Sequence, residues 1–162
     1  MASLVFGRAR NDAMRVAGPT WTDAPDPETL QDLPYIEGVT PEFTKHVAFR
    51  WVDGAFPYSG ADQAKFRAYA RFRAPAGGPE GLLALLDVWP CPSLSVLSKP
   101  AAASTVQWTA HFVDVPERLE SWLAYEYETV AGEGGFHSAR GQLFAPDGRL
   151  LALSEQLVAV FG

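Results

Sequence analysis

The sequence has a single cysteine, no long apolar run and no excess of basic residues. Cys91 stands alone among 162 residues, which excludes an intrachain disulfide and favours a reducing cytoplasm as the location. No apolar run approaches the ~20 residues that a membrane-spanning helix needs. The net charge of −6 argues against nucleic acid or an anionic membrane as the main partner.

Several catalytic signatures are also missing. The chain has no Gly-x-Ser-x-Gly elbow, no phosphate-binding glycine loop and no dinucleotide fingerprint. His46, His111 and His137 are scattered and have no cysteine or i, i+4 partner, so we expect no metal site. Cys91 lies between two prolines without an evident activating base, which favours a buried structural thiol over a nucleophile. We therefore expect neither a metal nor an organic cofactor.

The composition is that of one soluble globular domain, with 48% hydrophobic and 20% charged residues. Residues 2–9 are typical of a short strand. Residues 18–41 carry five prolines and five acidic residues, which predicts an extended linker over the surface. We therefore divide the chain into residues 1–41, a strand with a proline-rich linker, and residues 42–162, the main domain.

Hydrophobic periodicity indicates one helix among strands. Residues 45–52 and 65–73 alternate as half-buried strands do. From Pro79 to Asp87, Leu82, Leu85 and Leu86 follow helical spacing, which predicts a buried helix. Further strands are expected over residues 104–113, 121–130, 136–144 and 150–161, with turn signals between the last three. The order predicts an α+β fold, a curved antiparallel sheet wrapped around one central helix.

Three polar residues interrupt this apolar framework, namely Asp87, Thr105 and Gln156. Asp87 ends the helix beside apolar neighbours, which should raise its pKa and make it a better base. The alternative is a carboxylate that points into solvent or caps the next turn. A carboxylate, a hydroxyl and a carboxamide from separate elements are able to hold one water molecule.

Thr105 and Gln156 have simpler explanations as well. Threonine is a good strand former, and alternation places Thr105 with Gln107 on the face opposite Val106 and Trp108. Gln156 lies in a strand whose two faces are both apolar, so its amide needs partners. A structural hydrogen bond to a loop is the default for that amide.

Four segments carry a family resemblance. They are Leu82-Leu-Ala-Leu-Leu-Asp87, Ser104-Thr-Val-Gln-Trp-Thr-Ala-His-Phe112, Trp122-Leu-Ala-Tyr-Glu126 and Asp147-Gly-Arg-Leu-Leu-Ala-Leu-Ser-Glu-Gln156. Together they resemble the second half of the acyl-CoA thioesterase II (TesB-like) family, whose members are double hotdogs. In that family an Asp, a Thr and a Gln bind and activate the hydrolytic water, and these fall on Asp87, Thr105 and Gln156. Val106-Gln107-Trp108 stands where the family usually has an Asp-His pair.

The resemblance implies a hotdog fold and hydrolysis of an acyl-CoA or related thioester by water, in fatty acid metabolism and without a cofactor. It also implies that two hotdogs form the working unit, so we expect a homodimer. Backbone N–H groups at residues 77–81 are candidates for polarising the thioester carbonyl. The basic strand face of Lys65, Arg67, Arg71 and Arg73 is a candidate for coenzyme A phosphates, although a solvated face is favoured.

Two other functions stay open. A non-catalytic acyl-binding or assembly protein would keep the same framework. A different hotdog chemistry, such as dehydration, needs a His–acid pair for which the sequence offers no suitable placement.

Overall fold

The computed structural model describes residues 5, 7 and 16–161, so the strand expected over residues 2–9 lies almost entirely outside the described residues. One α-helix, α1 (Gly78–Asp87), is present among them. The strands are β1 (Val47–Gly54), β2 (Lys65–Phe72), β3 (Ala102–Phe112), β4 (Leu123–Glu133), β5 (Phe136–Phe144) and β6 (Leu150–Phe161). Three short 3-10 helices are η1 (Pro27–Thr29), η2 (Glu42–His46) and η3 (Pro92–Ser95).

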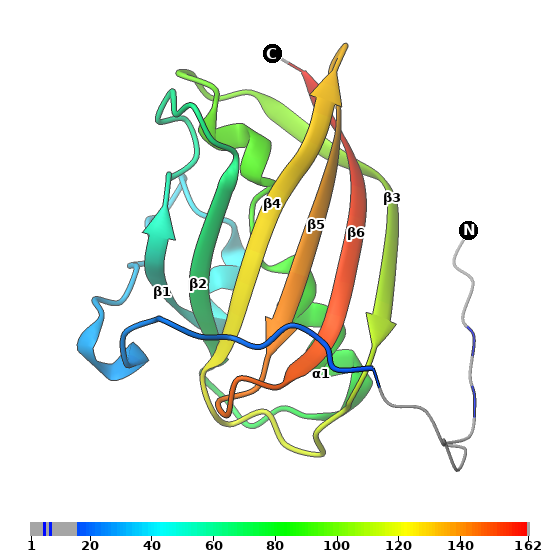
Figure 1. Ribbon diagram of the computed structural model, residues 1–162. Coiled ribbons are helices and arrows are strands. Elements are labelled where there is room, and N and C mark those ends of the chain that lie inside the picture. The colour runs from blue at the N-terminus through cyan, green and yellow to red at the C-terminus, as the bar shows by residue number, and fades with distance from the viewer. Residues whose placement is uncertain (1–4, 6, 8–15, 162) are drawn as a thin grey trace.

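The strands form one six-stranded sheet in the order β1-β2-β4-β5-β6-β3, and every neighbouring pair is antiparallel. The sheet curves, and α1 lies behind it in the view of Figure 1. The predicted α+β hotdog architecture, a curved antiparallel sheet around one central helix, is therefore confirmed.

The apolar stripe of α1 is buried against the concave face of the sheet. Leu82, Leu85 and Leu86 are 0%, 0% and 1% exposed, as the spacing predicted. A side chain at Gly81 would lie 2.7 Å from Leu119, so glycine there allows the helix to pack closely. Leu83, in contrast, is exposed, and the stripe is narrower than the sequence suggested. No helix within the described residues is long and apolar enough to cross a membrane.

Residues 16–33, here called the strap, cross the face of the sheet opposite α1 (Figure 1). The indole N–H of Trp21 donates to the hydroxyl of Tyr69 at 3.0 Å, and its backbone N–H donates to the carbonyl of Gly148 at 3.0 Å. Trp21 also packs on a second apolar cluster that includes Tyr69, Trp122 and Phe144. The strap thus covers part of the outer face, whereas Glu126, Arg140 and Glu155 on the same face are exposed.

The basic face of β2 is used to hold the strap. Arg67 pairs with Asp53 at 2.5 Å and donates to the carbonyls of Thr22 and Asp23. Arg71 lies 3.5 Å from the carboxylate of Glu28. These contacts favour the structural interpretation of this face over a phosphate site.

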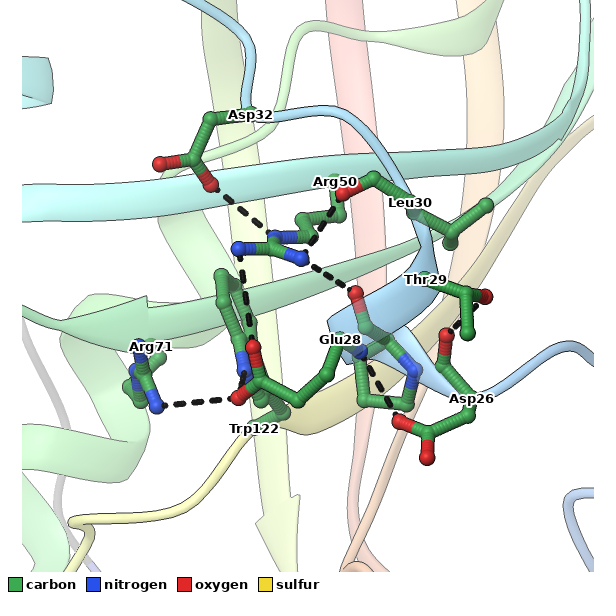
Figure 2. A network of polar contacts seen from close by, with 9 residues as sticks. Asp26, Glu28, Thr29, Leu30, Asp32, Arg50, Arg71 and Trp122 are labelled. Carbon is green, nitrogen blue, oxygen red and sulfur yellow. Dashed lines mark hydrogen bonds and ion pairs between the residues drawn. The ribbon is translucent and has the colours of Figure 1, made fainter.

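Figure 2 shows the contacts that fasten η1 to β1. Arg50 donates to two strap carbonyls at 2.5 and 2.7 Å and to the carboxylate of Asp32 at 3.0 Å. The guanidinium groups of Arg50 and Arg71 lie 4.7 and 4.4 Å from the centre of the Trp122 ring. The indole N–H of Trp122 donates to Glu28 at 2.8 Å. Arg50, which is mostly buried, is the centre of this network.

The two edges of the sheet differ. At the β1 edge, Asp32 forms an isolated bridge with Arg50, and the N–H of Leu33 donates to the carbonyl of Phe49 at 2.9 Å. At the other edge, β3 pairs with β6 alone among residues 16–161. Val106 and Phe112 of β3 are 56% and 41% exposed. Within residues 16–161 the chain thus pairs with part of the β1 edge and places no strand beside β3 on its outer side.

We predict that Arg50→Met lowers the free energy of unfolding by about 1–3 kcal/mol, because two strap carbonyls lose their donor while the aliphatic stem is kept. Urea denaturation measures the change. Arg140→Met is the control, since Arg140 is exposed and forms no ion pair in the described part of the chain. Equal stability of the two variants would show that the strap does not depend on Arg50.

Candidate functional site

Two of the three predicted site residues are in contact. Asp87 is the last residue of α1, and Gln156 lies in β6. The amide nitrogen Nε2 of Gln156 donates to Oδ1 of Asp87 at 3.3 Å. Gln156 is 8% exposed, so its amide is partnered by side chains, as a buried amide requires, and not by a loop.

Tyr127 of β4 completes this contact, and the sequence analysis did not single it out. Its hydroxyl donates to Oε1 of Gln156 at 2.6 Å. Because a donor faces Oε1, the amide presents its N–H₂ group to Asp87. The signal in the sequence was that the oxygen and the nitrogen of a buried glutamine amide each need a hydrogen-bond partner. Strands β4 and β6 are separated by β5, so the pairing needed a register that the sequence does not supply.

Burial by apolar neighbours raises the pKa of the Asp87 carboxyl, and the hydrogen bond from Gln156 opposes that rise in part. The Asp87 residue is nevertheless exposed. Burial also raises the pKa of the Tyr127 hydroxyl, which therefore stays protonated and serves as a donor. The site thus contains an accessible carboxylate of enhanced basicity and a fixed amide beside it.

Thr105 is exposed and forms no hydrogen bond to Asp87 or Gln156 in the described structure. The face of β3 on which Thr105 lies differs from the prediction, because the predicted alternation is wrong at this point of the strand. Thr105 pairs with Val158, whereas Gln107 pairs with Leu157, so Val106 forms a β-bulge.

The bulge moves Thr105 to the face of β3 that points toward α1. Opposed residues in an antiparallel pair share a face, and both Val158 and Gln156 lie on the inner side of β6. Trp108 pairs with Gln156 and donates from its indole N–H to Ser154 at 2.8 Å. Thr105 therefore shares a face with Trp108 and not with Gln107. Periodicity alone cannot locate an inserted residue.

The first turn of α1 lies away from Asp87. The helix has ten residues and rises ~1.5 Å per residue, which separates its two ends by roughly 13–15 Å. The start of the helix is therefore not in contact with the carboxylate of Asp87 in the same chain. The role expected for the N–H groups of residues 77–81 in polarising the thioester carbonyl stays a prediction.

Asp87 lines an apolar cavity of about 690 Å³. The walls come from residues 33–44, from β1, from residues 56–58, from the end of α1 and from the start of β3. Ala103, two residues before Thr105, belongs to the β3 wall. The sequence analysis treated residues 33–41 as a linker and did not foresee that they form part of a site.

The other candidate residues remain outside this arrangement. Cys91 is buried, with its Sγ 3.1 Å from the hydroxyl of Ser93, which agrees with a structural thiol. Within the ranges that the structure describes, no three His, Cys, Asp or Glu side chains are grouped as metal ligands would be.

Comparison with protein families bears directly on this arrangement. The family described as acyl-CoA thioesterase C-terminal domain matches residues 22–160. The chain belongs to this family. None of the curated proteins compared with the chain matches it.

Solved structures with the same fold include other hotdog proteins, all of low sequence identity. A hotdog protein of unknown function from Alicyclobacillus acidocaldarius has a TM-score of 0.80 at 19% identity and matches 94% of this chain and 59% of its own. The acyl-CoA thioesterase II TesB2 of Mycobacterium marinum has a TM-score of 0.69 at 16% identity, with 95% and 60% covered. The tesB protein of Mycobacterium avium subs paratuberculosis has a TM-score of 0.72 at 17% identity, with 91% and 56% covered. The thioesterase-domain chain thus spans about three fifths of the length of these structures.

We expect the ionised carboxylate of Asp87 to lower the free energy of unfolding near neutral pH. Its folded pKa is raised, so the native state holds the proton more tightly than the unfolded state does. The stability that protonated Asp87 contributes is fully present below its pKa in the unfolded state. It is lost as the pH rises through its pKa in the folded state. We expect Asp87→Asn to be more stable than the wild type at pH 7, and the difference to vanish at acidic pH. Thermal unfolding from acidic pH to pH 7 measures the difference in stability between the variant and the wild type. A difference that does not change with pH would contradict the raised pKa of Asp87.

Proposed function

We propose that this chain hydrolyses an acyl thioester of the acyl-CoA type with a water molecule activated by Asp87. The observation that carries the proposal is the contact between Asp87 and Gln156 at an apolar cavity, in a chain of the acyl-CoA thioesterase C-terminal domain family. An apolar cavity suits the acyl group, and a carboxylate of raised pKa at its wall suits a general base.

In the proposed reaction the water oxygen attacks the thioester carbonyl carbon while Asp87 accepts a proton from the water. The tetrahedral intermediate then collapses, the carbon–sulfur bond breaks, and the proton passes to the thiolate. The products are a carboxylic acid and the free thiol of coenzyme A. A raised pKa helps this cycle because the base both accepts and returns the proton near neutral pH.

Gln156 and Tyr127 act as positioning residues in this proposal. The amide N–H₂ of Gln156 has two donor hydrogens, and one is directed at Asp87. Its second donor hydrogen is available to the water, and Tyr127 prevents the amide from turning over. The inward face of Thr105, set by the bulge at Val106, supports a further contact of its hydroxyl with water or substrate.

We further propose that a second copy of the chain pairs along the open edge of β3. This edge is eleven residues long and carries exposed apolar side chains, whereas the β1 edge is bridged in part by Asp32 and Leu33. A two-fold axis across the two β3 strands would continue the sheet. Since the first turn of α1 lies far from its own Asp87, its N–H groups serve a site formed with the second copy in this proposal.

Asp87→Asn should reduce kcat by ~10²–10⁴-fold, because the change removes the base and keeps the shape of the side chain. Release of free thiol from a panel of acyl-CoA esters measures the rate. Gln156→Leu, Tyr127→Phe and Thr105→Val should each cost less, since these residues only orient the water.

Asp62→Asn is the matched control for Asp87, because Asp62 is exposed and lies outside the cavity wall. It should retain wild-type rates. Full activity in Asp87→Asn with an intact fold would exclude this mechanism.

Val106→Lys should shift the protein from dimer to monomer, because it places a charge on each side of the proposed β3 junction. Light scattering coupled to size-exclusion chromatography measures the mass. Val130→Lys is a closely matched control, since Val130 of β4 is 54% exposed and lies at a bulge in an interior strand. A wild-type protein that is monomeric at micromolar concentration would refute the pairing.

A non-catalytic acyl-binding protein is the second candidate. The observation in its favour is that Thr105, the third residue of the predicted set, is exposed and contacts neither Asp87 nor Gln156 by a hydrogen bond in the described structure. The thiol-release assay separates the two functions.

A further inference from the structure

We propose that the cavity at Asp87 binds an uncharged acyl group that carries an aromatic ring. The proposal rests on the thioesterase function above and names the class of acyl group that the site takes. It is carried by the aromatic character of the cavity wall and by the hydrogen bonds that the hydroxyl groups of that wall already form within the protein.

Aromatic residues dominate the wall. Seven of the twenty residues that line the cavity are aromatic, and they come from segments far apart in the sequence. Trp51 of β1 stacks on Phe56 with 4.3 Å between ring centres, and Phe49 meets Trp89 edge to face at 5.0 Å. Tyr35 and Phe43 add rings from the segment that follows the strap. Trp51 also stacks on Phe66 at 4.5 Å. The partly exposed rings of Phe43 and Phe56 are therefore the ones that offer faces and edges to another ring.

The hydroxyl groups of the wall already form hydrogen bonds within the protein. The hydroxyls of Tyr35 and Tyr58 donate to Glu42 and to the carbonyl of Ala101, respectively. The hydroxyls of Thr40 and Thr44 donate to backbone carbonyls of their own segment. The indole N–H of Trp89 is buried and is the one unpartnered side-chain donor that the described structure shows in a wall residue. A ligand in the cavity therefore meets few free polar partners, and a hydroxylated or amidic group would lose most of its hydrogen bonds to water.

Charge gives a second constraint. Asp87 is the one charged residue among those that the structure places in the wall. Its carboxylate disfavours a second negative charge nearby, and none of the described residues places a cation in the wall to balance one. A carboxylate-ended acyl group and the phosphates of coenzyme A are therefore excluded from the cavity. The thioester carbon lies at Asp87, with the acyl group inside and the coenzyme A portion outside.

Residues 33–44 set the shape of the site. This segment supplies eight of the twenty lining residues, and η2 within it places Phe43 in the wall. Phe43 and Phe56 are 45% and 48% exposed, so both rings border the open side of the cavity. A flat aromatic acyl group is able to stack on these rings or meet them edge to face, contacts that a linear chain cannot form.

The test compares phenylacetyl-CoA with octanoyl-CoA, which have equal numbers of acyl carbons. Thiol release gives kcat/KM, and calorimetry with the corresponding non-hydrolysable thioethers gives affinity. We expect a roughly 3- to 10-fold preference for the phenylacetyl group in both readouts, as ring–ring contacts predict. A carboxylate-ended thioester should bind more weakly than either.

Phe43→Ala and Phe56→Ala should remove most of that preference, whereas Phe136→Ala should keep it. Phe136 is the control because it is 54% exposed and does not line the cavity. Both test residues are half exposed, so the variants are expected to fold, and thermal unfolding checks this.

The outcomes separate this inference from the hydrolase proposal. Binding of the phenylacetyl thioether without hydrolysis of any thioester would support the cavity assignment and overturn the hydrolase. Hydrolysis with equal or greater preference for octanoyl-CoA would overturn the cavity assignment alone. Failure of both thioethers to bind would also overturn it.

Discussion

The burial of α1 against the concave face of the sheet is the constraint on which the other features depend. Full burial of a leucine is worth roughly 1.5–3 kcal/mol, and Leu82, Leu85 and Leu86 are all buried completely or nearly so. Because the helix is only ten residues long, this packing fixes both of its ends. One end carries Asp87 to Gln156 of β6. The other end lies roughly a helix length away from that contact.

The strap and the segment after it give the two faces of the sheet different roles. On the outer face, residues 16–33 are fastened by Arg50, Arg67 and Trp21 and cover the part of the sheet that they cross. The chain then passes the β1 edge at Asp32 and reaches the inner side, where residues 33–44 form cavity wall. Fastening the strap on one face thus determines the shape of the site on the other.

The regular parts of the fold were predictable from the sequence, and the irregular parts were not. The alternation of Phe66, Ala68 and Ala70 and the helical spacing of the leucines report burial directly, because each pattern repeats with the geometry of its element. The bulge at Val106 adds one residue without changing the local pattern, so the face of Thr105 was assigned wrongly. The proline-rich segment has no period, so its place in the cavity wall depends on tertiary contacts alone. The contact of Asp87 with Gln156 was expected, but its third member, Tyr127, required the register across β5.

Asp87 is exposed at the cavity, and burial by its apolar neighbours nevertheless raises its pKa. At the C-terminus of α1 the helix dipole and apolar neighbours both disfavour its charge, yet the open cavity still admits water. In the proposed reaction an apolar acyl group that fills the cavity removes part of this water. The desolvation of the carboxylate then increases, and its pKa rises further when substrate is bound. Gln156 remains in contact throughout and retains enough stabilisation for the charged form to accept a proton. The free protein therefore avoids the full free-energy cost of desolvating the carboxylate. In the proposed reaction this cost arises only while the acyl group occupies the cavity.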